Sequence, residues 1–245
     1  MLGMLKKWAV KAFDDGLGQC NKLGMKLIAR KNVDRFLDVG CGDGKLTLDF
    51  ARVINPKEIY GIEYVDEVRA LAEKNGIKCI KSDLNDKWGY GSGFFDIIMS
   101  SQSIEHMHNT RLYLEEAYRC LKPSGQLVVL TENLASWMNI WALVFGWQPF
   151  SITNINGWSI GNPLGVYRDE KKDENFFNKY SAVSGTVGHV RVVAYTCLKE
   201  MLERVGFKQV KIFTRGYLPC FGWFSNLMCR IDRKHGHFLI ATGIK

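Results

Sequence analysis

The sequence lacks an apolar run long enough to cross a membrane. A membrane-spanning helix needs about 20 consecutive, mostly apolar residues. The richest apolar stretch, residues 134–150, is interrupted by polar residues, glycines and a proline. At the amino terminus the lysines follow the first apolar residues, which reverses their order in a secretory signal. We therefore expect a cytoplasmic protein with no transmembrane segment.

Paired cysteines are also missing. The seven cysteines are an odd number, and none has the C-x-x-C spacing of a zinc site or a redox motif. His235 and His237 have no cysteine beside them, so we interpret them as residues of a surface turn. The sequence therefore predicts reduced thiols, most of them buried, and no metal site.

The chain has no localised run of lysine and arginine. Its net charge is +8, from 33 basic and 25 acidic residues, and the excess lies near the two ends of the chain. Such charge can attract nucleic acid or an anionic membrane surface. Because the charge is dispersed, nucleic acid is an alternative partner that the sequence does not favour.

Short apolar runs alternate with amphipathic segments over most of the chain. The pattern predicts strands at 33–39, 58–63, 77–82, 95–100, 126–131, 208–214 and 237–244, and helices at 45–53, 66–74, 110–121 and 196–205. This alternation is typical of βαβ units, so we predict an α/β fold with a parallel sheet.

Two segments lie outside this alternation. Residues 1–32 form an N-terminal helical segment that we expect to break at Gly16 and Gly18, and residues 33–245 form the main domain. Within that domain, residues 134–190 are an aromatic-rich insertion, which we expect to cap the ligand-binding edge of the sheet. Aromatic residues from Trp137 to Phe150 recur three or four apart, which predicts an apolar stripe on a helix. Three interpretations of the stripe are open: it is part of the hydrophobic core, it lines a ligand pocket, or it makes weak contact with a membrane.

A glycine-rich turn, Asp38-Val39-Gly40-Cys41-Gly42-Asp43-Gly44, follows the first predicted strand and opens a helix. Glycine permits positive φ and lets a ligand approach the backbone. Open α/β sheets bind ligands at the carboxyl ends of their strands. The G-x-G-x-G spacing differs from the G-x-G-x-x-G of dinucleotide-binding proteins. Asp38 suits a ligand that carries positive charge.

Acidic residues also end the next two predicted strands. Glu63 can accept both hydroxyls of a ribose, and Asp83 can accept a hydrogen bond from the amino group of an adenine. Each acid also has a structural alternative: Asp38 as a helix cap, Glu63 as an exposed strand end, and Asp83 as an Asx turn before Asn85.

In order and spacing, these segments resemble the motifs of class I S-adenosylmethionine-dependent methyltransferases over about residues 33–132. The resemblance implies a Rossmann-like, seven-stranded, mostly parallel sheet with helices on both faces and an antiparallel last strand. It implies S-adenosylmethionine as the cofactor, with Asp38 and Gly40 at its methionine part and Gly42 and Gly44 shaping the turn.

The same resemblance implies roles for residues at the next strand ends. Glu63 would bind the ribose, and Tyr64 would pack beside the adenine. The pair Asp83 and Leu84 would contact the adenine ring. The pair Ser101 and Gln102 would approach the cofactor from below, although many relatives have an acid in place of this glutamine.

Two histidines are candidates for a catalytic base, because imidazole titrates near neutral pH. His106 follows the fourth predicted strand, and His189 lies in a Gly-His-Val-Arg segment after the insertion. The alternative for both is structural: His106 supporting the cofactor site, and His189 holding the insertion to the sheet.

The predicted function is methyl transfer from S-adenosylmethionine to a small-molecule acceptor, either apolar or sugar-containing. Three alternatives stay open. One is a nucleic-acid methyltransferase, which the missing Asn-Pro-Pro-aromatic motif disfavours. The others are a nicotinamide-dependent oxidoreductase, and a binding protein that kept the fold and lost the reaction.

Overall fold

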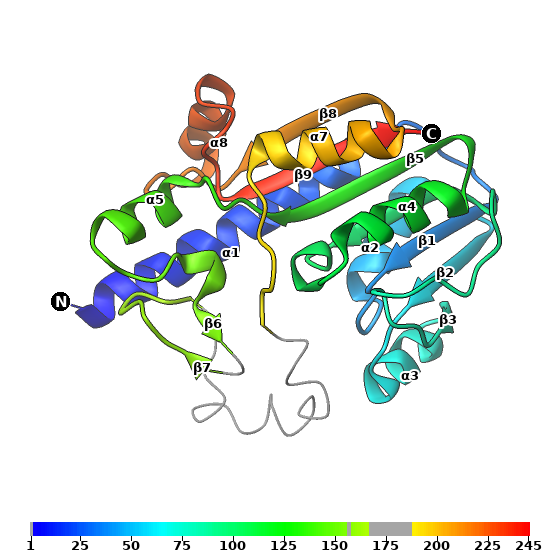
Figure 1. The fold of residues 1–245 in the computed structure, drawn as a ribbon, viewed down its shortest axis with the longest axis horizontal. Coiled ribbons are helices and arrows are strands. Elements are labelled where there is room, and N and C mark those ends of the chain that lie inside the picture. Colours follow the sequence, from blue (N-terminus) through cyan, green and yellow to red (C-terminus); the bar gives the residue numbers. More distant parts are fainter. Residues whose placement is uncertain (1, 156–157, 167–187) are drawn as a thin grey trace.

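The computed structural model describes residues 2–155, 158–166 and 188–245 (Figure 1). At its centre is a seven-stranded sheet with the strand order β3-β2-β1-β4-β5-β9-β8. Neighbouring strands from β3 to β5 are parallel, and β9 is antiparallel to both β5 and β8. The predicted mostly parallel sheet with an antiparallel last strand is thus confirmed. The strands are β1 (Arg35–Val39), β2 (Glu58–Ile62), β3 (Lys78–Ile80), β4 (Phe95–Ser101), β5 (Leu121–Glu132), β8 (Lys208–Arg215) and β9 (Phe238–Ile244).

Helices cover both faces of the sheet (Figure 1). They are α1 (Leu2–Lys26), α2 (Lys45–Ile54), α3 (Asp66–Lys74), α4 (Thr110–Cys120) and α7 (Tyr195–Val205). Helices α4 and α7 pack on one face, and α1 and α2 pack on the other. Side chains alternate along a strand, so Leu37 reaches the first face while its neighbour Phe36 reaches the second. Because helices cover both faces of the sheet, the inner strands carry apolar side chains on both sides.

Helix α1 is one continuous helix, and the predicted break at Gly16 and Gly18 is wrong. The glycine at position 16 has a packing role. A Cβ atom there would lie 3.0 Å from the Cα atom of Gly216 and 3.1 Å from the ring of Phe238. The missing side chain therefore lets the helix approach the sheet closely, which offsets the low helix propensity of glycine.

The segment after β5 extends beyond the carboxyl ends of the strands. It contains α5 (Trp137–Val144), a 3-10 turn η2 (Phe150–Ile152) and a small hairpin of β6 (Asn154–Ile155) and β7 (Trp158–Ser159). The predicted stripe does not lie on one helix, because the chain turns at Gly146, where φ is 70°. The charged run at 168–174 lies outside the described residues. A further helix, α8 (Gly222–Ile231), was not predicted.

His237 is buried, which corrects its interpretation as a surface residue. Its side chain is 1% exposed, and its Nε2 lies 3.5 Å from the Glu132 carboxylate. His235 is half-buried and bonds to Asp232. Among the helices that the structure describes, none combines the length and hydropathy of a membrane span.

Candidate cofactor and acceptor site

The glycine turn links β1 to α2 and packs tightly against its neighbours. Gly40 has φ +76°, and a Cβ atom there would lie 2.4 Å from the Ser103 hydroxyl. Gly44 precedes α2 with φ +82°, and a Cβ atom there would lie 2.3 Å from Ile77. Both positions combine left-handed backbone with a close approach, so any larger residue is strained there.

Asp38 lies beneath this turn and is 2% exposed. Its Oδ2 accepts a hydrogen bond of 2.6 Å from the Thr47 hydroxyl. Its Oδ1 is buried and has no hydrogen-bond partner among the described residues. Burial disfavours the charged carboxylate and raises the pKa of Asp38 to about 7, against the opposing effect of the Thr47 hydrogen bond.

This pKa makes folding stability depend on pH. The folded protein holds the Asp38 proton more tightly than the unfolded chain does. We therefore expect the free energy of unfolding to fall by about 4 kcal/mol from this group as pH rises from about 4 to 7. Urea denaturation at several pH values measures the total fall, to which buried Glu105, whose pKa is also raised to about 7, contributes as well. Asp38→Asn should remove only the part that comes from Asp38. The control Asp34→Asn, at an exposed ion pair, should leave it in place. An equal fall in the Asp38→Asn protein would contradict this origin.

A cavity of about 410 Å³ opens at the carboxyl ends of β1, β2 and β4. We call it the cofactor cavity. It brings together seven of the predicted site residues, which are Gly40, Glu63, Tyr64, Asp83, Leu84, Gln102 and His106. The five others, Asp38, Gly42, Gly44, Ser101 and His189, are outside its described lining. The lining also includes residues that the sequence analysis missed, among them Ser82, Asn85, Ser103, Met107 and His108. Each lies within a few sequence positions of a predicted residue, and this closeness is the signal that could have indicated it.

The Glu63 carboxylate is held in place by the backbone. One oxygen accepts from the amide of Gly42 at 3.0 Å, and the other accepts from the amide of Val65 at 2.9 Å. A carboxylate oxygen accepts more than one hydrogen bond. Glu63 therefore presents an oriented acceptor pair to the cavity, as a ribose diol requires.

Asp83 makes the Asx turn that the sequence analysis gave as its structural alternative. Its Oδ1 accepts from the backbone amide of Asn85 at 2.8 Å. Asn85 in turn accepts from the amides of His108 and Asn109. The turn thus fixes two walls of the cofactor cavity to each other, and Asp83 still lines the cavity.

Gln102 has φ +52°, an uncommon conformation for a residue other than glycine. Its Nε2 is buried and has no hydrogen-bond partner in the part of the chain that the structure describes. Buried polar atoms are nearly always hydrogen-bonded. The unpaired Nε2 of Gln102, the unpaired Oδ1 of Asp38 and the oriented Glu63 carboxylate therefore fit a polar ligand with an amino acid part and a ribose.

The two predicted histidines lie together although they are far apart in sequence. The rings of His106 and His189 are 4.7 Å apart and nearly perpendicular. The Nδ1 of His106 is 3.1 Å from the carbonyl of Gly188, and the Nδ1 of His189 is 2.6 Å from the carbonyl of Ser151. A carbonyl only accepts, so each Nδ1 donates, and each Nε2 carries the lone pair in the neutral ring.

Glu105 lies behind this pair and is fully buried. Its carboxylate accepts from the Thr131 hydroxyl at 2.8 Å, and burial raises its pKa to about 7. Ligand atoms of Glu105, His106 and His189 lie within 4.8 Å of one another. One carboxylate and two imidazoles are a donor set for a divalent transition metal. These three residues could hold such an ion, although the sequence analysis predicted no metal site.

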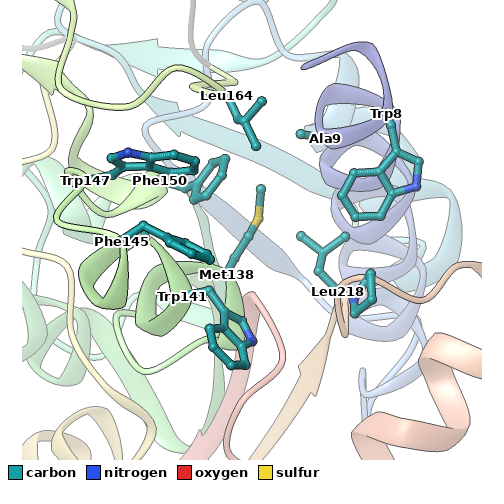
Figure 2. Close-up of a pocket in the computed structure, with 11 residues that line it drawn as sticks. Trp8, Ala9, Met138, Trp141, Phe145, Trp147, Phe150, Leu164 and Leu218 are labelled. Carbon is teal, nitrogen blue, oxygen red and sulfur yellow. The ribbon is translucent and has the colours of Figure 1, made fainter. Parts of the chain in front are cut away.

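A second pocket lies between α1 and the segment after β5 (Figure 2). We call it the cap pocket. Its volume is about 240 Å³ and its lining is almost entirely apolar. Trp8 and Leu218 stand on one side, facing Trp141 and Phe145 on the other. Also lining it are Ala9, Met138, Ala142, Trp147, Phe150, Leu164 and Pro219.

The histidine pair is linked to the walls of both spaces. His106 lines the cofactor cavity. His189 contacts His106 and bonds to Ser151, whose neighbour Phe150 lines the cap pocket. Through Ser151, the imidazole pair thus links the lining of a polar cavity that fits a nucleoside to the segment that lines an apolar pocket. Such an arrangement can transfer a group between a bound cofactor and an apolar molecule.

Comparison with known proteins gives several methyltransferases among the relatives. Demethylmenaquinone methyltransferase of Lactobacillus johnsonii is 27% identical over 76% of this chain and 73% of its own length. The mitochondrial ubiquinone biosynthesis O-methyltransferase of Rattus norvegicus is 28% identical over 46% of this chain. The aligned region is 35% of the rat enzyme's length.

A solved structure has the same fold. The S-adenosylmethionine-dependent methyltransferase of Mesorhizobium loti superposes with a TM-score of 0.59 at 19% identity, over 91% of this chain and 96% of that one. The family model described as a methyltransferase domain matches residues 16–212. This match spans most of the sequence, so the chain belongs to the methyltransferase-domain family.

Proposed function

We propose that this enzyme uses S-adenosylmethionine, bound in the cofactor cavity, to methylate a hydroxyl group on an apolar small molecule of the phenol or quinol class. The observation that carries the proposal is the imidazole pair, in which His106 lines the cofactor cavity and His189 is bonded to Ser151, the neighbour of Phe150 in the lining of the cap pocket. The names of the rat and Lactobacillus relatives, which concern ubiquinone and demethylmenaquinone, support the acceptor class.

The residues of the cofactor cavity bind and orient the cofactor in this proposal. Glu63 accepts the ribose hydroxyls, while Gly40 lets the methionine part lie against the backbone. The unpaired Nε2 of Gln102 offers a donor to the cofactor. S-adenosylmethionine would supply a methyl group on a positively charged sulfur. The acceptor oxygen would attack the methyl carbon in line, and the sulfur would leave as a neutral thioether.

The cap pocket and the two histidines position the acceptor and remove its proton. The cap pocket holds the apolar part of the acceptor and excludes water from it. A phenolic hydroxyl attacks faster once it loses its proton, and the Nε2 of His106 accepts that proton. His189, bonded to the cap through Ser151, orients His106. Methyl transfer then depends chiefly on alignment of the acceptor oxygen with the methyl group.

An acceptor screen with methyl-labelled S-adenosylmethionine tests the proposal. The panel contains prenylated phenols and quinols, the same headgroups without the prenyl chain, sugars, RNA and DNA. We expect label on the prenylated compounds, with kcat/KM at least tenfold lower for the chainless headgroups, because the chain is buried in the cap pocket. Transfer to nucleic acid alone, or no saturable S-adenosylmethionine binding by calorimetry, would overturn it.

The metal-compatible geometry of Glu105, His106 and His189 favours a second candidate for the acceptor side. There, a divalent ion on these three residues would bind the acceptor oxygen in place of a histidine base. Assays with EDTA separate the two candidates. If turnover is unchanged in EDTA, the result supports His106 as the base. If turnover is lost in EDTA and returns on addition of Mg²⁺ or Zn²⁺, the result supports the metal ion.

A further inference from the structure

Helix α8 exposes its apolar side chains and buries its small ones. Trp223 is 76% exposed, Ile231 is 70% exposed, and Leu227 between them is also exposed. The residues that α8 buries are Ser225 and Cys229. A surface helix of a soluble domain normally does the opposite, with its apolar stripe against the core. The apolar face of α8 therefore has no partner among the described residues.

Helix α5 has the same inverted character. Trp141 is 55% exposed and Phe145 is 62% exposed, and Leu143 and Val144 are exposed between them. The sequence has no Asp, Glu, Lys or Arg from position 133 to position 166. Contiguous exposed apolar surface of this kind marks an interaction site.

These two helices form one surface with the amino-terminal end of α1. The indole of Trp137, on α5, donates to Asp232, directly after α8, at 2.8 Å. At the other end of α8, Phe221 packs edge-on against Trp8 of α1, with 5.6 Å between ring centroids. All three elements lie at the same end of the molecule in Figure 1. We call this surface, which shares Trp8, Trp141 and Phe145 with the lining of the cap pocket, the cap face.

Basic residues border the cap face. Lys6, Lys7 and Lys11 are exposed on the first turns of α1, where the sequence has no acid before Asp14. Arg230, Arg233 and Lys234 are exposed at the end of α8. Acids near them are Asp232, which accepts from Trp137, Tyr217 and His235, exposed Asp14, and Asp15, which accepts from Gln19 and from the backbone amide of Gly222. The basic residues named here outnumber these acids, so the border carries a net positive charge.

We propose that the cap face docks on an anionic membrane surface. Tryptophan and aliphatic side chains suit the boundary between headgroups and acyl chains, and lysine and arginine around them bind anionic headgroups. A second copy of the chain fits less well. A symmetric contact through this face would bring the same positive border together from both copies. The docking itself does not rest on the proposed acceptor.

Docking also gives the cap pocket a route of entry. Trp8 and Trp141 are exposed on the cap face, and both also line the pocket (Figure 2). A molecule dissolved in the bilayer would then reach the pocket without crossing water. This last step rests on the proposed function, because it assumes that the pocket takes an apolar acceptor.

Vesicle flotation with the full chain tests the docking. We expect the protein to float with vesicles of phosphatidylcholine and phosphatidylglycerol, and much less with phosphatidylcholine alone. Trp223→Ser combined with Ile231→Ser should weaken binding at least tenfold. The control Leu71→Ser removes a side chain that is 37% exposed on α3, at the other end of the molecule, and should bind as the parent does. Lys6→Glu with Lys7→Glu, or added salt, should weaken binding as well.

Three results would overturn the docking. The first is failure of the parent protein to float with anionic vesicles at low salt. The second is equal vesicle binding by the Trp223→Ser/Ile231→Ser protein. The third is sedimentation that shows a dimer which these substitutions dissociate while vesicle binding is unchanged. S-adenosylmethionine binding, measured by calorimetry without vesicles, should be the same in every variant. Failure of the docking can thus be told from failure of the proposed function.

Discussion

Replacing His106 with alanine is expected to lower kcat roughly 100- to 10,000-fold for a phenolic acceptor, the usual contribution of a positioned general base. The Nδ1 of His106 donates to the Gly188 carbonyl, so its Nε2 is the nitrogen that can take the acceptor proton. Single-turnover assays with labelled cofactor measure the chemical step directly. The dissociation constant of S-adenosylmethionine should change much less than kcat.

His108 is the matched control, since its imidazole lines the same cavity. His108→Ala keeps the His106–His189 pair intact, and we expect turnover within about tenfold of the parent enzyme. An equal loss in both variants would contradict a catalytic role for His106, because the cavity wall would then be the common cause. EDTA in the assay keeps the base and metal candidates apart.

Glu63→Gln is expected to raise the dissociation constant of S-adenosylmethionine roughly 100-fold. Hydrogen bonds to a charged acceptor contribute about 1.5 to 3 kcal/mol each, and replacing the carboxylate weakens two of them, for a loss of about 3 kcal/mol. Calorimetry gives the constant. S-adenosylhomocysteine, which has the same ribose, should lose affinity by a similar factor.

Glu58→Gln is the control for this substitution. Glu58 begins the same strand, bonds to Lys78 and Arg35 at the opposite edge of the sheet, and is remote from the cavity. Its replacement should leave cofactor affinity within about threefold. A similarly small change for Glu63→Gln would show that this carboxylate does not bind the ribose, and that its bonds to Gly42 and Val65 are structural.

The strands and helices of the parallel part of the sheet could be predicted from the local pattern of apolar and polar residues. Strands β1, β2 and β4 and helices α2 and α3 lie within a few residues of their predicted bounds, because apolar periodicity reports burial directly. The break predicted in α1 failed for a different reason. From sequence alone, a glycine predicts a break in a helix. In the structure, Gly16 allows α1 to approach Gly216 and Phe238, which are remote in sequence.

The site was predictable only where it lies on the strand ends. Glu63 and Asp83 follow strands whose order the pattern gives, so their common cavity could be expected. The contact of His106 with His189 could not, because it depends on the path of the segment after β5. The burial of His237 depends on Glu132, more than 100 residues away, and no local pattern reports such a pairing.

The distribution of indoles gives the protein an unusual optical property. Of its seven tryptophans, only Trp88 lies in the core against α4. The other six, on α1, α8 and the segment from α5 to β7, are Trp8, Trp137, Trp141, Trp147, Trp158 and Trp223. Intrinsic fluorescence is therefore dominated by the end of the molecule that carries the cap pocket. Emission will report events there, and melting of the sheet is better followed by circular dichroism.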